Sequence, residues 1–168
     1  IPPMLDLIRA SVSGGVPVIG HCLGGQMLAK ALGAKVTRNP VKEIGWREVD
    51  VHEGRIAARW GPAHPFLSYH WHGETFSLPE GAVRIWSSAH CANQAFVLGP
   101  HLAMQCHVEM TPELIRAWCR SSPRRIRRAA SEMPRAFAVL RLITNSKFVG
   151  CATGRSAGLA PLRILSTK

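Results

Sequence analysis

The chain has 168 residues, of which 46% are hydrophobic, and a formal net charge of +11. The length predicts a single domain with its own core, and the sequence has no run of about 18 apolar residues that could form a transmembrane span. The five cysteines are an odd number without a C-x-x-C pair, which argues against a disulfide framework and a structural zinc site and favours a cytoplasmic protein.

The first predicted element is an amphipathic helix. It follows Pro2-Pro3, its apolar residues recur at positions 4, 5, 7, 8 and 12, and Gly14-Gly15 ends it. The segment lacks the basic start and the long apolar core of a signal peptide, and it has no initiator methionine. We therefore expect the chain to begin inside a longer natural protein.

Residues 16–33 carry the pattern that bears most on function. Residues 16–19 predict a short buried strand and residues 26–32 predict a helix capped by Gly33, with G-H-C-L-G between them. A nucleophile between glycines at a strand-to-helix turn is typical of a nucleophile elbow, here centred on Cys22. The helix start favours a thiolate, and the backbone N–H of Leu23 can donate to an oxyanion. A glycine-rich turn with a buried, inert cysteine would give the same short pattern.

The following segments predict several strands and one further helix. Asn39-Pro40 ends the first of these strands, and Gly99-Pro100 joins two that run antiparallel. Thr111-Pro112-Glu113 begins a helix that extends to about residue 119. The helix–strand–helix order around Cys22 predicts a parallel α/β sheet. The expected strands are residues 34–37, 44–51, 83–86, 94–98 and 102–106.

A second group of chemically active residues follows the strand predicted at 102–106. His107 and Glu109 are two residues apart and share a face in extended backbone, so His107 can reach a nucleophile while Glu109 holds its ring. A cysteine, a histidine and an acid are the groups of an activated thiol. His21 is expected to point to the opposite side of the chain from Cys22 and to serve in packing.

Two further histidines share a face, but their context favours a structural role. His70 and His72 have a spacing that could bind a metal, yet no carboxylate or third histidine stands at a supporting spacing. We therefore interpret them as neutral structural histidines and expect no metal site. The cysteines at 91, 106, 119 and 151 are interpreted as small buried hydrophobes or incidental thiols.

Three motifs together resemble the class I glutamine amidotransferases, in particular the free-standing domains similar to the glutaminase part of GMP synthase. They are G-H-C-L-G-G-Q at 20–26, H-G-E-T-F at 72–76 and Q-C-H-V-E at 105–109. The resemblance covers residues 1–119. It implies an α/β fold, a three-layer flavodoxin-like sheet with helices on both faces, whose first strands are missing from this chain.

The resemblance also implies roles for particular residues. Cys22 would attack the side-chain amide of L-glutamine and form a γ-glutamyl thioester, with His107 moving the protons and Glu109 fixing His107. Leu23 would supply the backbone oxyanion donor, and Gln26 would help to hold the substrate. The family implies no cofactor, and it implies a synthetase partner that accepts the ammonia.

The chain departs from the family pattern at both ends. A glycine-rich loop that gives relatives a second oxyanion N–H has no match here, and loss of one such donor lowers the rate by about a hundred- to a thousand-fold. We expect the chain as written to be weakly active or inactive for this reason. At the other end, residues 120–168 carry 11 Lys/Arg and one acid, whereas residues 1–119 carry 10 Lys/Arg and 9 acids. This basic tail resembles nothing expected of the family, and an altered reading frame or a foreign extension would explain it.

The tail and the thiol each leave an alternative function open. The tail, residues 120–168, is interpreted as a solvated, disordered segment with one weak helical patch at 136–143. It could bind nucleic acid through phosphates, which would make the chain a non-catalytic basic binding protein, but interleaved aromatic residues are few. The pair Cys22 and His107 would equally serve a hydrolase of γ-glutamyl peptides. We expect no membrane partner.

Overall fold

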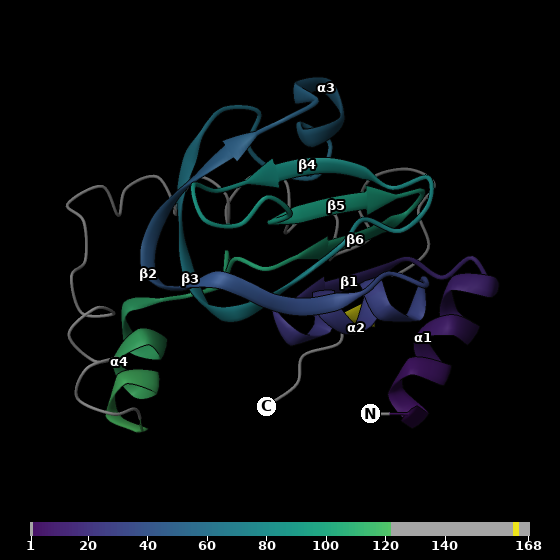
Figure 1. Ribbon diagram of the computed structural model, residues 1–168, viewed down its shortest axis with the longest axis horizontal. Helices are drawn as coiled ribbons and strands as arrows, with labels where there is room; N and C mark the ends of the chain where they lie inside the picture. Colours follow the sequence, from purple (N-terminus) through teal and green to yellow (C-terminus); the bar gives the residue numbers. More distant parts are fainter. Residues whose placement is uncertain (1, 122–162, 165–168) are drawn as a thin grey trace.

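The computed structural model describes residues 2–121 and 163–164, and their strands form a seven-stranded sheet in the order β3-β2-β4-β5-β6-β1-β7 (Figure 1). The strands are β1 Val18–His21, β2 Val36–Val51, β3 Phe66–Phe76, β4 Val83–Ser87, β5 Ala95–Leu98, β6 His101–Met104 and β7 Arg163–Ile164. The helices are α1 Pro2–Ser13, α2 Leu23–Ala31, α3 Gly54–Ala57 and α4 Pro112–Ser121. The expected α/β fold class is confirmed.

The sheet is mixed rather than parallel throughout. Strand β1 runs parallel to both of its neighbours, β6 and β7, whereas the pairs β2–β3, β2–β4, β4–β5 and β5–β6 are antiparallel. Strands β5 and β6 are joined at Gly99-Pro100 as expected, and a connection this short permits antiparallel pairing alone. The expectation of a parallel sheet therefore holds around β1 and is wrong for the antiparallel remainder.

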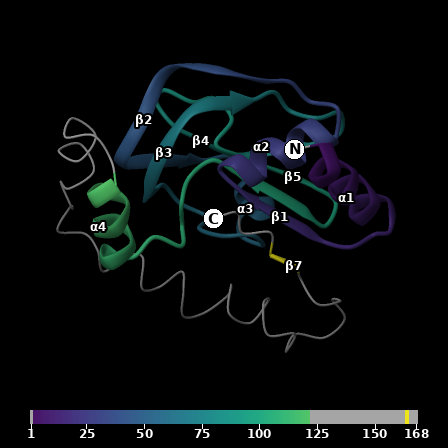
Figure 2. The same cartoon turned by 90° about the horizontal axis from the view of Figure 1, so that it is seen from below.

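The central strands are buried on both faces. In β1, Val18 packs with α1 and α2 on one face, while its neighbour Ile19 packs with Trp86 in the cluster on the other. This alternation follows from the period of two along a strand. Figures 1 and 2 show α1 and α2 together near β1, with α4 at the opposite end of the molecule. The face covered by α1 and α2 has a buried core of Leu5, Ile8, Val18, Met27, Leu28, Ala29, Phe76, Phe96 and Ala103.

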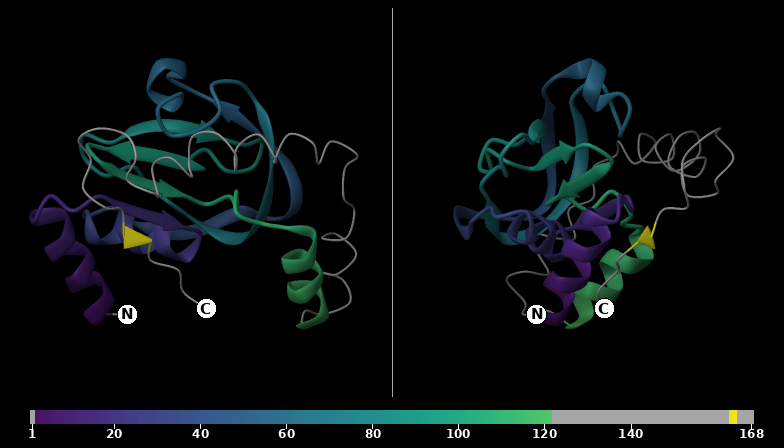
Figure 3. Two further views of the ribbon diagram at one scale, coloured as in Figure 1. Left: turned by 180° about the vertical axis from the view of Figure 1, so that it is seen from behind. Right: turned by 90° about the vertical axis from the view of Figure 1, so that its right-hand side faces the viewer.

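Strand β2 is longer than the sequence predicts. It continues through Asn39-Pro40 and joins the two strands expected at 34–37 and 44–51. Its pairing with β3 shifts register between Arg38 and Glu43, where a proline can be accommodated because the ladder is interrupted. The Asn39 amide closes this irregular segment by donating to two backbone carbonyl oxygens. Figure 3 shows the long β2–β3 ribbon curling away from the other strands.

The helix α4 begins as the sequence predicts. The backbone N–H of Leu114 donates to Thr111 Oγ1 over 3.2 Å, which is the expected N-terminal cap. The helix packs against β2 and β3 through a buried cluster of Trp46, Tyr69, Met110 and Ile115. This packing places the end of the segment after β6 against the middle of β3.

Part of the tail lies outside the described residues. The disorder expected for residues 120–168 falls mostly outside the described residues, as does the whole helical patch at 136–143, so both remain predictions; residues 120–121 are described as the end of α4. Residues 163–164 are described as β7, in parallel register with Val18 and Ile19 of β1. No helix in the described part of the chain is both long enough and apolar enough to cross a bilayer.

Candidate active site

Cys22 occupies a strained turn between β1 and α2. Its backbone has φ 47° and ψ −109°, in the positive-φ range that L-residues rarely adopt. The turn is tied down by the Cys22 N–H, which donates to the carbonyl oxygen of Met104 over 2.8 Å. A Cβ on Gly20 would lie 2.4 Å from the carbonyl oxygen of Gly24, so the turn leaves no room for a side chain there. This is the backbone geometry of a nucleophile elbow.

His107 and Glu109 lie together beside this turn. The ring Nδ1 of His107 is 2.6 Å from Glu109 Oε1, and its backbone N–H donates to the carbonyl oxygen of Tyr69 over 2.7 Å. The sequence predicts this contact from an extended backbone, but residues 108–109 form a turn and β6 ends at Met104. The two side chains therefore meet because the chain turns, which corrects the expected geometry while leaving the expected pair in contact.

The surroundings of His107 favour its charged form. Burial opposes a charge on the ring, but the neighbouring Cys22 side chain and Glu109 outweigh it and raise the pKa of His107 to about 9. Burial would likewise raise the pKa of Glu109, yet hydrogen bonds and charge from His107 and His21 hold that pKa far below its usual range. The pair is therefore an imidazolium and a carboxylate at neutral pH.

His21 takes part in this arrangement, contrary to the expectation that it serves in packing. Its Nδ1 lies 3.2 Å from Glu109 Oε2, so one carboxylate bridges His21 and His107. The reason is that Glu109 reaches back across the carboxyl end of β1, where His21 is the last residue of the strand.

Strand β3 and helix α4 border the thiol and the imidazole. The Cys22 Sγ lies 3.8 Å from the carbonyl oxygen of Trp71. The indole of Trp118 meets the His107 ring edge-on, with centroids 5.1 Å apart, and it meets the Trp71 ring in the same way at 5.6 Å. Trp118 covers one side of the imidazole and itself packs against Trp71, and sequence patterns alone did not single out either tryptophan for the site.

Leu23 and Gln26 lie on the helix that follows the thiol. Leu23 is the first residue of α2, so its N–H has no acceptor within the helix. Gln26 is buried, and its Nε2 donates to Gln105 Oε1 over 3.3 Å. The structure thus brings Cys22, Leu23, His107 and Glu109 to one place, and it sets the Gln26 amide into a buried polar network beside them.

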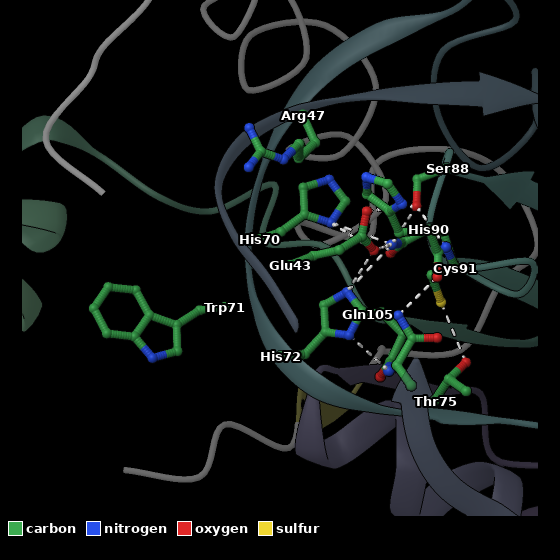
Figure 4. A network of polar contacts seen from close by, with 12 residues as sticks. Glu43, Arg47, His70, Trp71, His72, Thr75, Ser88, His90, Cys91 and Gln105 are labelled. Carbon is green, nitrogen blue, oxygen red and sulfur yellow. Dashed lines mark hydrogen bonds and ion pairs between the residues drawn. The ribbon is translucent and has the colours of Figure 1, made fainter. Parts of the chain in front are cut away.

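His70 and His72 point away from the thiol into a separate buried cluster. Figure 4 shows both rings on the side of β3 opposite the Trp71 indole. Each faces the carboxylate of Glu43, with His72 Nε2 3.2 Å and His70 Nδ1 3.9 Å from Glu43 Oε2. Burial would raise the pKa of Glu43, but the neighbouring His72 side chain and a hydrogen bond from Ser88 lower it, and burial lowers the pKa of His70 to about 3.

The carboxylate beside these histidines was missed by sequence analysis. Glu43 lies directly opposite His72 in the β2–β3 register, although the two are far apart in sequence. A search at local spacing around residues 70–72 could not find it. The pairing of β2 with β3 was the signal that would have revealed this carboxylate.

The chain belongs to the class I glutamine amidotransferases, because residues 1–117 match the family described as Glutamine amidotransferase class-I. The structure is similar to a glutamine amidotransferase from Methylobacillus flagellatus, with 43% identity, a TM-score of 0.71, and coverage of 84% of this chain and 60% of that one. A glutamine amidotransferase from Thermotoga maritima gives 32% identity and a TM-score of 0.70, with 83% and 64% covered. The expected family and its flavodoxin-like fold are confirmed.

Sequence relatives point to the same family. The putative glutamine amidotransferase-like protein YfeJ of Salmonella typhimurium is 33% identical over 118 residues, which is 65% of this chain and 47% of that protein. The GMP synthase of Acinetobacter baylyi is 37% identical over 83 residues, 46% of this chain and 14% of the synthase. The chain thus spans about half the length of the YfeJ protein that it resembles.

Proposed function

We propose that this chain carries a glutaminase site that releases ammonia from L-glutamine through a γ-glutamyl thioester on Cys22. The sulfur of Cys22 attacks the side-chain amide carbon as a thiolate, with its proton already on the His107 imidazolium. The N–H of Leu23 stabilises the oxyanion that forms on the amide oxygen. His107 then protonates the departing ammonia.

The second half of the reaction uses the same groups. Water attacks the thioester carbon and gives up a proton to His107, and the bond to sulfur breaks to release glutamate. The sulfur leaves as a thiolate, His107 keeps the proton that it took from water, and the new carboxyl group of glutamate loses its proton to solvent, so the site is restored. Glu109 keeps the imidazole oriented throughout, and Gln26 helps to hold the substrate beside the turn.

The observation that carries this proposal is the strained turn at Cys22 with the charged His107–Glu109 pair beside it. Family membership supports glutamine as the substrate. A nucleophile held at φ 47° needs support from the surrounding structure, and such strain gathers at functional sites. The raised pKa of His107 supports its role as the acid that protonates the leaving ammonia.

The ammonia would pass to a synthetase partner, as the likeness to GMP synthase suggests. In the Acinetobacter baylyi synthase, the matching region makes up 14% of the protein. The free thiols of Cys22, Cys91, Cys106 and Cys119 support a place in the cytoplasm. A hydrolase of γ-glutamyl peptides with the same thiol is the other reaction to be tested.

The test is glutamate release by the full chain from L-glutamine, with γ-glutamyl peptides assayed in parallel. Cys22→Ala should abolish release, whereas the matched variant Cys119→Ser should retain it. An electrophilic glutamine analogue provides a second measurement, because one adduct on Cys22 is expected by mass spectrometry even when turnover is slow. Release that survives Cys22→Ala, an adduct elsewhere, or hydrolysis of γ-glutamyl peptides without hydrolysis of glutamine would overturn the proposal.

A further inference from the structure

A second cluster of chemically active side chains is buried on the far side of β3 from the thiol. Glu43 comes from β2, His72 from β3, and Cys91 and Gln94 from the connection between β4 and β5 (Figure 4). Their exposed fractions are 1%, 6%, 1% and 0%. Neither the proposed glutaminase reaction nor the family motifs give this cluster a role.

The hydrogen bonds around His72 show which ring nitrogen carries the proton. Its Nδ1 lies 3.0 Å from the carbonyl oxygen of Glu74, which can only accept. Gln105 Nε2 donates to the same Glu74 carbonyl, and it lies 3.4 Å from His72 Nδ1, which is a longer contact than that of Nδ1 with the carbonyl oxygen. His72 is therefore protonated on Nδ1 in its neutral form, and its Nε2 presents a lone pair.

That lone pair faces other electron-rich atoms. His72 Nε2 is 3.2 Å from Glu43 Oε2, and the amide nitrogen of Gln94 lies 2.6 Å from the same oxygen. The Gln94 nitrogen is also within 3.2 Å of His72 Nε2, of His70 Nδ1 and, at 3.1 Å, of Ser88 Oγ. An amide has two N–H groups and can donate to at most two of these four neighbours, while the amide oxygen of Gln94 is buried with no partner among the described residues.

Cys91 completes a set of ligand atoms. Its Sγ, a carboxylate oxygen of Glu43 and a ring nitrogen of His72 all lie within 4.8 Å of one another. Thr75 Oγ1 is 3.2 Å from the sulfur and could donate to a thiolate, and Ser88 Oγ donates to the other oxygen of Glu43 over 2.8 Å. A metal-bound histidine commonly donates its second N–H to a backbone carbonyl, as His72 does to Glu74.

We propose that Glu43, His72 and Cys91 form a structural site for one zinc-type divalent cation, with Gln94 as the fourth ligand through its amide oxygen. Nitrogen, oxygen and sulfur are the ligand atoms that zinc accepts, and a closed, buried site suits a structural ion. Turning the Gln94 amide over brings its unpartnered oxygen toward the cluster, where a cation would supply the positive charge that the gathered lone pairs lack. The ligands come from β2, β3 and the connection between β4 and β5, so no C-x-x-C spacing in the sequence indicates the site.

The site would stabilise the strand that borders the thiol. Glu43 and His72 lie on paired strands, and Trp71, next to His72, has its carbonyl oxygen beside the Cys22 sulfur. An ion bound there would fix β2, β3 and the β4–β5 connection to one another. Metal binding would then appear as folding stability, because the site does not exist in the unfolded chain.

The experiment measures metal in the full chain carrying Cys22→Ala, which removes the half-buried thiol of the elbow as a competing ligand. The protein is refolded with Zn²⁺ or Co²⁺ and dialysed against a weak chelator. The proposal expects about one zinc per chain and a sulfur-to-cobalt charge-transfer band in the near ultraviolet. Cys91→Ser should lose the band and most of the zinc, whereas Cys106→Ser, at another buried cysteine, should keep both.

A second protein keeps the test decisive if Cys91→Ser does not fold. In it, the cysteines at 22, 106, 119 and 151 are all replaced, and Cys91 alone remains. The charge-transfer band and a rise in melting temperature on adding Zn²⁺ should persist in this protein. The proposal is overturned if the Cys22→Ala chain retains no metal, if its melting temperature does not respond to Zn²⁺, or if the band survives Cys91→Ser.

Discussion

The ring Nδ1 of His107 lies 2.6 Å from Glu109 Oε1, across a turn of the chain two residues long. This distance is that of a strong, charge-assisted hydrogen bond. The contact fixes which nitrogen of the ring holds its proton and leaves the other nitrogen for chemistry at Cys22. The orientation of His107 therefore depends on one carboxylate, which can be removed with little change in shape.

Glu109→Gln should slow glutamine hydrolysis by about a hundred-fold or more, since the ring loses its orienting charge. The charge of Glu109 also helps to raise the pKa of His107, so that pKa should fall toward 6.5 in the variant. The high-pH limb of the rate profile should move to lower pH, which a pH series of glutamate release measures. An unchanged limb would show that Glu109 does not act through His107.

His21→Ala should have a smaller effect on the same reaction. The contact of His21 with Glu109 is partly exposed, and partly exposed ion pairs contribute about 0.2–1 kcal/mol. The rate should fall by at most about fivefold, because Glu109 keeps its shorter contact with His107. Rate measurements on the single and double variants with Glu109→Gln would show the effect of His21 vanish once Glu109 is neutral. An effect of equal size in both backgrounds would mean that His21 acts independently of the carboxylate.

Gly20→Ala should destabilise the chain strongly. The new Cβ would lie 2.4 Å from the backbone oxygen of Gly24, and backbone cannot move aside as a flexible side chain does. A loss of about 3 kcal/mol or more in the free energy of unfolding is expected, measured by urea denaturation. Gly54→Ala is the matched control, because its nearest neighbour would be 4.0 Å away. Equal stabilities of the two variants would contradict the close packing at the elbow.

The parts of the fold and the site that could be predicted from sequence are those fixed by neighbouring residues. The elbow at Cys22, the hairpin at Gly99-Pro100 and the cap at Thr111 each follow from a short local pattern, and the structure has all three. The His107–Glu109 contact was also predicted, although from the wrong backbone conformation.

Features that depend on strand pairing could not be predicted in the same way. The continuation of β2 through Asn39-Pro40 requires a register shift against β3, which local breaking signals do not reveal. The same register brings Glu43 to His72. No carboxylate stands near the histidines in the sequence, but one lies beside them in the structure, so the expectation that no carboxylate supports them is wrong. The contact of His21 with Glu109 was hidden for the same reason, because it depends on how β1 and the segment after β6 meet.

The stability of the chain should depend on pH through His107. Its pKa is about 9 in the folded chain and 6.5 for the ordinary side chain, so the folded state holds the proton more tightly. The resulting stabilisation is fully present below pH 6.5 and is lost as the pH rises through about 9, with a total of at most about 3 kcal/mol. Urea denaturation of the wild-type chain and of His107→Gln, at about pH 6 and about pH 9.5, isolates this contribution from the loss of packing, which is the same at both pH values. The stability advantage of the wild-type chain should shrink at the higher pH, and an advantage that stays constant would show that His107 is not held in its charged form.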